Sequence, residues 1–174
     1  MTMSLDAVSR VAAIVVSLMA CVTDVRGRRI PNLLTFSAAG AAILFHFVTA
    51  GPQAALLSVA GWLVGVLIFA PVFALGGLGA GDLKLLGAIG AWLGPLKALY
   101  MVLLTGIAGG VMALVVMVAR GYSRTAGRNI FLMLTSWRLG IAAVPGVTLA
   151  DAPGPRLAYA LPIAAGTVLT LWLY

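Results

Sequence analysis

The sequence contains few charged residues and no glutamate. Only 9% of its 174 residues are charged, whereas about a quarter of a typical soluble domain is charged. So few charges cannot cover a globule with a water-compatible surface, and 63% of the residues are hydrophobic. The composition therefore excludes an ordinary soluble domain. It predicts an all-α, polytopic membrane protein.

Cysteine and histidine each occur only once, as Cys21 and His46. A single cysteine excludes an intramolecular disulfide and any CxxC-type zinc or redox site. One histidine cannot form a histidine cluster, so metal-dependent hydrolysis is disfavoured and we expect no metal and no other cofactor. Any chemistry must come from aspartates, hydroxyl groups or lysines.

The charge balance is basic, with eleven Lys and Arg residues against four Asp. The cations stand between apolar runs, which is how the cytoplasmic loops of membrane proteins are marked. Nucleic-acid binding would need a folded basic face exposed to solvent. We therefore expect the lipid bilayer, and not nucleic acid, as a partner.

The charge-free intervals predict about six transmembrane helices in one domain that covers residues 1–174. At roughly 20 apolar residues per crossing, this length allows six spans and short loops. Cytoplasmic loops are expected at about 24–30, 76–82 and 120–155, and residues 128–139 read as an amphipathic interfacial helix. The spans are expected at about 5–23, twice within 30–81 with a turn at Ala50–Gln53, at 83–95, at 96–119 and at 157–174.

The segment 83–95 is short for a crossing, and a re-entrant helix is the alternative. If it crosses, most of the cations, including the arginines of 120–138, face the same side of the membrane as Arg26, Arg28 and Arg29. That distribution agrees with the positive-inside rule, whereas a re-entrant helix would violate it. The sequence therefore favours six spans in the inner membrane.

Two of the four acids stand where an apolar helix meets the cytoplasmic side. Asp24 and Asp82 are separated by 58 positions, yet the span count places both at one face. Taken singly, Asp24 has a simple structural explanation as a partner of Arg28, and Asp82 as a helix N-cap. The other acids, Asp6 and Asp151, are interpreted as solvated loop residues.

A pair of carboxyl groups in a partly desolvated site holds one proton, because both cannot easily ionise. Such a pair can activate water and protonate a carbonyl oxygen, as in the aspartic proteases. Gly79 and Gly81 precede Asp82 and would let an extended peptide approach the backbone. Lys84 either holds the charge state of Asp82 or extends to the membrane interface.

The segment Gly79-Ala-Gly-Asp82-Leu-Lys84 resembles the GxGD block of the type IV prepilin peptidases. Asp24, followed by Arg29-Ile-Pro-Asn32, resembles the segment around the other catalytic aspartate of that family, and 159–166 resembles its closing helix. The resemblance implies catalytic roles for Asp24 and Asp82, with Gly79 and Gly81 shaping the site. In size the chain is similar to the small form that serves Flp, or tight-adherence, pili, or to an archaeal relative.

The resemblance implies cleavage of the leader peptide of prepilins or pilin-like proteins at the cytoplasmic face. Larger family members carry two CxxC pairs and also methylate the new terminus. This chain has only Cys21, so neither zinc nor S-adenosylmethionine is predicted. The alternative is a small transporter or a noncatalytic pilus-assembly subunit whose aspartates bind a proton or cation. Which aspartate acts as base is left open.

Overall fold

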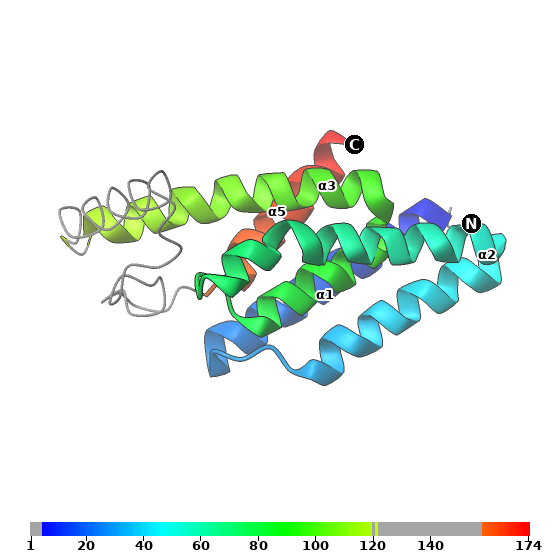
Figure 1. The fold of residues 1–174 in the computed structure, drawn as a ribbon, viewed down its shortest axis with the longest axis horizontal. Coiled ribbons are helices and arrows are strands. Elements are labelled where there is room, and N and C mark those ends of the chain that lie inside the picture. Colours follow the sequence, from blue (N-terminus) through cyan, green and yellow to red (C-terminus); the bar gives the residue numbers. More distant parts are fainter. Residues whose placement is uncertain (1–4, 120, 122–157) are drawn as a thin grey trace, which may run out of the picture.

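The computed structural model describes residues 5–119, 121 and 158–174, and the ordered elements in these residues are all helices (Figure 1). Helices α1, α2 and α3 are each long and apolar enough to cross a membrane, and α5 is a shorter apolar helix. The predicted all-α fold is thereby confirmed, and the described residues include three candidate membrane spans. The helices are α1 (Leu5–Gly27), α2 (Asn32–Ala74), α3 (Ala80–Ala119) and α5 (Ala160–Leu173).

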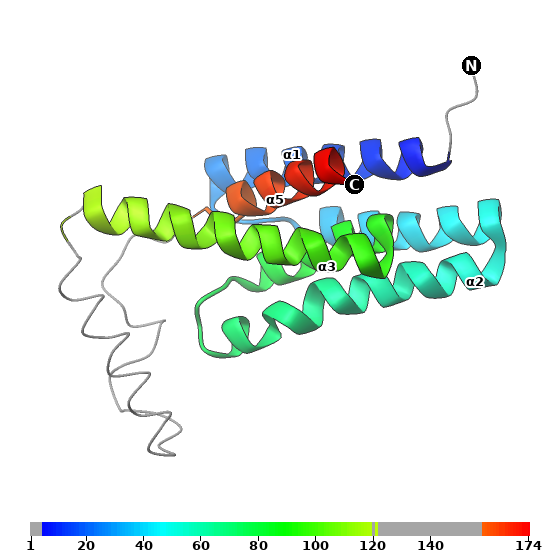
Figure 2. The ribbon, with the colours of Figure 1, turned by 90° about the horizontal axis from the view of Figure 1, so that it is seen from above.

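Two long helices are interrupted by a glycine followed by a proline. Gly51 in α2 has φ 83°, and Gly94 in α3 has φ 74°. Glycine tolerates this left-handed conformation, and the proline after it suits the first turn of the next helical segment. The chain reverses at both breaks (Figures 1 and 2). The predicted turn at Ala50–Gln53 is thus confirmed, and the described residues contain six helical segments.

The ends of the helices differ from the predicted loop boundaries. Helix α1 continues to Gly27, so Asp24 lies inside a helix and not in a loop that starts at residue 24. Helix α3 begins at Ala80, so Asp82 also lies inside a helix. Both acids therefore have helical backbone conformations. The predicted loop at 120–155 and the interfacial helix at 128–139 lie outside the described residues, apart from Gly121.

The second segment of α2 and the first segment of α3 pack with their backbones in close contact. A Cβ atom placed on Gly61 would collide with the carbonyl oxygen of Gly90, and one on Gly65 would collide with that of Leu86. Ser58 reinforces the contact by donating a hydrogen bond of 2.8 Å to the Ala91 carbonyl. Small residues at such interfaces let membrane helices approach closely. The first segment of α3, which begins at the GxGD block, is thereby held firmly.

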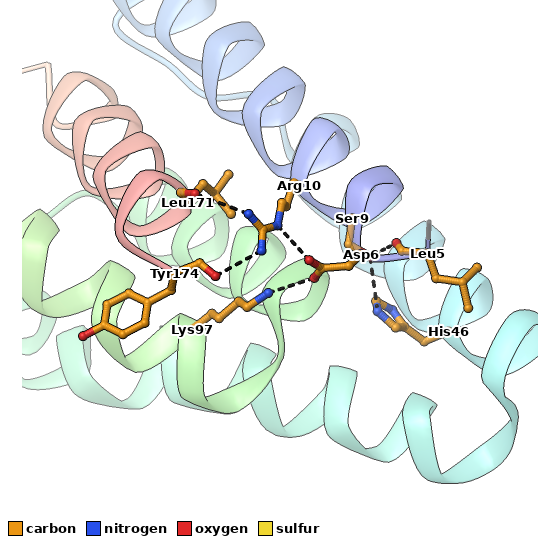
Figure 3. Close-up of polar contacts among 8 residues, drawn as sticks. All are labelled: Leu5, Asp6, Ser9, Arg10, His46, Lys97, Leu171 and Tyr174. Atoms are coloured by element: carbon orange, nitrogen blue, oxygen red, sulfur yellow. Dashed lines mark hydrogen bonds and ion pairs between the residues drawn. The ribbon is translucent and has the colours of Figure 1, made fainter. Parts of the chain in front are cut away.

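Asp6 joins three helices at the end of the bundle where α1 begins (Figure 3). Its carboxylate accepts hydrogen bonds from Arg10 and from Lys97 of α3, both at 2.8 Å. Arg10 also donates to the Tyr174 carbonyl oxygen at 3.0 Å, which connects the end of α5. Asp6 is exposed, as predicted, but the prediction that it lies in a loop is wrong, because it belongs to the first turn of α1 and pairs with Arg10 and Lys97. Its partner Lys97 lies 91 positions away in the sequence, so no local sequence pattern indicates this contact.

Candidate active site

Asp24 lies in the last turn of α1 and is buried, with 8% of its surface exposed. Its Oδ2 accepts a hydrogen bond of 3.3 Å from the backbone N–H of Ala160, the first residue of α5. The Cys21 thiol, one turn earlier in α1, donates to the carbonyl oxygen of the same Ala160 at 3.0 Å. The start of α5 is thus held against α1 on the face that carries Asp24.

Asp82 lies in the first turn of α3 and is partly buried. Its Oδ2 accepts a hydrogen bond of 3.3 Å from the backbone N–H of Gly79, just before the helix. The Gly79 carbonyl accepts the N–H of Leu83 at 3.2 Å, so Gly79 is the N-cap position and Asp82 stands three residues later. An acidic side chain that turns back to the N-cap N–H forms half of a capping box. The prediction that Asp82 is the N-cap residue is therefore wrong, because Asp82 occupies the third position after the N-cap.

The link between α1 and α2 lies against the glycines before Asp82. A Cβ atom on Gly81 would lie 3.2 Å from Cβ of Ile30, tighter than ordinary van der Waals contact. Pro31 then leads into α2, with an extended backbone at φ −62° and ψ 135°. The absence of a side chain on Gly81 therefore lets the segment that follows Asp24 approach the start of α3.

These contacts bring Asp24 and Asp82 to the same end of the bundle. Ile30, in the link that follows Asp24, contacts Gly81 next to Asp82, and the start of α5 contacts Asp24 through the N–H of Ala160. Two carboxyl groups at one end of the bundle, one buried and one partly buried, have the composition needed for general acid and base catalysis. In the described part of the chain, no group of three His, Cys, Asp or Glu side chains is arranged to hold a metal.

Lys84 contacts the beginning of α2. Its Nζ donates a hydrogen bond of 2.9 Å to Oδ1 of Asn32 and lies 5.1 Å from the centre of the Phe36 ring. Both ion pairs found among the described residues involve Asp6, so neither joins Lys84 to Asp82. Lys84 therefore connects the starts of α2 and α3, two positions after the GxGD aspartate.

Sequence reasoning missed Ala160 as a partner of Asp24. A backbone N–H is available at almost every residue, so no side-chain pattern could identify this donor. The available signal was the likeness of residues 159–166 to a family's closing helix, which singled out the segment without giving it a contact. The structure places its second residue, Ala160, beside Asp24.

Substituting Gly79 by Ala is expected to reduce any reaction that depends on Asp82 and to cost about 1 kcal/mol of stability, because the displaced carboxylate loses its capping hydrogen bond from Gly79. The added Cβ would lie 2.8 Å from Oδ2 of Asp82 and would force the carboxylate away from its present position. A displacement of about 1 Å can reduce a rate about a hundredfold. Turnover and the thermal unfolding midpoint, measured on the same preparation, check this. A wild-type turnover would contradict it.

Comparison with known proteins identifies one family. A model of the type IV leader peptidase family matches residues 11–114, which is more than half of the chain and includes both Asp24 and Asp82. The resemblance noted from the sequence is confirmed at the level of the family. No curated protein and no solved structure matches the chain.

Proposed function

Because the chain belongs to the type IV leader peptidase family, we propose that it is a membrane aspartic endopeptidase that removes the leader peptide of prepilins or pilin-like proteins. What supports the proposal is the placement of the two acids: Asp24 lies in the last turn of α1, Asp82 lies in the first turn of α3, and the link that follows α1 packs at Ile30 against Gly81, the residue before Asp82. The family makes the protein a peptidase, and the two acids supply its aspartic mechanism.

In this mechanism the two carboxyl groups share one proton. The ionised group takes a proton from water, and the protonated group donates a hydrogen bond to the scissile carbonyl oxygen. The water then attacks the carbonyl carbon and forms a tetrahedral intermediate. Proton transfer to the leaving nitrogen breaks the peptide bond and returns the pair to its starting state. Gly79 has no side chain beside the Asp82 carboxylate and leaves room there for an extended substrate backbone, whereas Ile30 occupies the space next to Gly81.

The six helical segments are proposed to be six membrane spans. Asp6 and Lys97 meet at one end of the bundle, whereas Asp24 and the start of α5 meet at the other. Arg26, Arg28 and Arg29 follow Asp24 directly, and in the described residues Arg10 and Lys97 lie at the opposite end. The positive-inside rule then favours a cytoplasmic position for the acids in the inner membrane.

The proposed substrate has an apolar helix that lies in the bilayer and a cationic leader that reaches the two acids. Co-expression with a candidate prepilin, followed by gel electrophoresis and mass determination of the product, tests this. We expect a shortened prepilin with one new N-terminus when the peptidase is present, and none without it. Uncleaved prepilin in both cultures, with the peptidase present in the membrane, would favour the transporter or assembly-subunit alternative for this chain.

A further inference from the structure

Arg28 has a backbone conformation that favours glycine. Its φ is 48°, and it is the one non-glycine residue with positive φ in the described part of the chain. It directly follows α1, and its N–H caps the helix by donating to the Asp24 carbonyl oxygen at 2.8 Å. Helices commonly place glycine at this position, because a Cβ atom is disfavoured there. Here the glycine stands one residue earlier, at Gly27, inside the helix.

The strained residue belongs to a cluster of exposed cations. Arg26, Arg28 and Arg29, here called the arginine rim, are all exposed at the end of an apolar helix long enough to cross a membrane. Neither ion pair found among the described residues involves them. A strained backbone conformation costs free energy, so its persistence suggests that the side chain at that position has a function. At Arg28 that side chain is an exposed guanidinium group at the end of a candidate membrane span.

We propose that the arginine rim binds the phosphate groups of anionic phospholipids, and that Arg28 is kept in its strained conformation for this contact. Guanidinium groups pair well with phosphate because their N–H donors match two phosphate oxygens. Lipid headgroups lie at the level where a membrane-spanning helix ends, so the rim and the phosphates occupy the same layer. Each cation near an anionic leaflet strengthens the attraction by about fivefold.

One consequence rests on the proposed function. A cationic leader that approaches Asp24 must pass three exposed arginines, which would repel it. Anionic headgroups bound at the rim would neutralise these charges, so the leader would meet the acids without a positive barrier. Anionic lipid should therefore lower the KM for prepilin and leave kcat nearly unchanged.

The direct test measures lipid selectivity and needs no peptidase activity. The protein is reconstituted in phosphatidylcholine vesicles, and spin-labelled phosphatidylglycerol is compared with spin-labelled phosphatidylcholine for motionally restricted sites. We expect wild type to prefer phosphatidylglycerol over phosphatidylcholine. This preference should be about fivefold weaker in Arg28→Gly and nearly unchanged in Arg28→Lys. Inorganic phosphate should not compete if the site belongs to lipid. Equal selectivity in wild type and in Arg28→Gly would overturn the proposal, as would displacement of the labelled lipid by phosphate.

Stability separates a binding role from a structural one. Glycine adopts the conformation of Arg28 without strain, so Arg28→Gly should raise the thermal unfolding midpoint by about 2–4 °C. In vesicles containing phosphatidylglycerol the same variant should show a KM for prepilin about fivefold higher. A lower unfolding midpoint with unchanged selectivity would show that the arginine serves the fold instead. If wild type cleaves no prepilin, the proposed function fails, and the spin-label measurement still decides the lipid site.

Discussion

Replacing Asp82 by Asn is expected to abolish leader cleavage, with a fall in rate of about a thousandfold or more, and Asp24→Asn should have the same effect. An amide can neither take a proton from water nor donate one to the leaving nitrogen, and general acid–base groups contribute up to about 10⁴-fold. The fold should persist, because the amide oxygen of Asn still accepts the N–H of Gly79 or of Ala160. The measurement is the initial rate of prepilin cleavage in membranes with matched peptidase content.

The double variant distinguishes a shared site from two independent ones. Residues that act as a unit are strongly non-additive, so Asp24→Asn with Asp82→Asn should be no slower than either single variant. Asp6→Asn is the matched control, since Asp6 lies at the opposite end of α1 from Asp24. It should keep most of the cleavage activity, although it weakens the ion pairs with Arg10 and Lys97. A wild-type rate in either Asp24→Asn or Asp82→Asn would refute the aspartic mechanism.

The course of the chain was largely predictable because membrane insertion imposes simple rules. Long apolar runs must form helices, since unpaired backbone groups are expensive in lipid. The Gly-Pro pairs at 51–52 and 94–95 marked the reversals, because they combine a residue that tolerates positive φ with one that restarts a helix. Helix ends were less predictable. Asp24 and Arg26 are charged, yet α1 continues through them to Gly27, since charge alone does not end a helix at a membrane surface.

The site was predictable as a pair of residues but not in its contacts. Counting crossings predicts Asp24 and Asp82 at one end, and in the structure they lie in the last turn of α1 and the first turn of α3, where Ile30 of the α1–α2 link contacts Gly81. The hydrogen bond from Ala160 depends on how α5 packs on α1, which no local pattern encodes. The bond from Lys84 to Asn32 was also missed, because the sequence directed attention to the nearest acid and not to a residue 52 positions away.

Substituting Gly61 by Ala is expected to destabilise the fold by about 3 kcal/mol, near the upper range for overpacking a well-packed interior. The new Cβ would collide with the Gly90 carbonyl oxygen, and backbone cannot move aside as a flexible side chain can. Separating α2 from α3 would also strain the hydrogen bond from Ser58 to Ala91. The check is the unfolding midpoint of the purified protein in detergent, followed by circular dichroism.

Gly40→Ala in the same helix α2 is the matched control. A Cβ there meets no atom within 4 Å, and Gly40 is exposed. Alanine is a better helix former than glycine, so this variant should gain about 0.5–1 kcal/mol. Both variants replace glycine by alanine. If Gly61→Ala loses stability and Gly40→Ala gains it, the loss comes from the contact of Gly61 with α3 and not from the removal of a glycine. Because α3 begins two residues before Asp82, Gly61→Ala should also lower cleavage at temperatures below its unfolding midpoint. Equal stability of the two variants would mean that the α2–α3 backbone contact does not form in the purified protein.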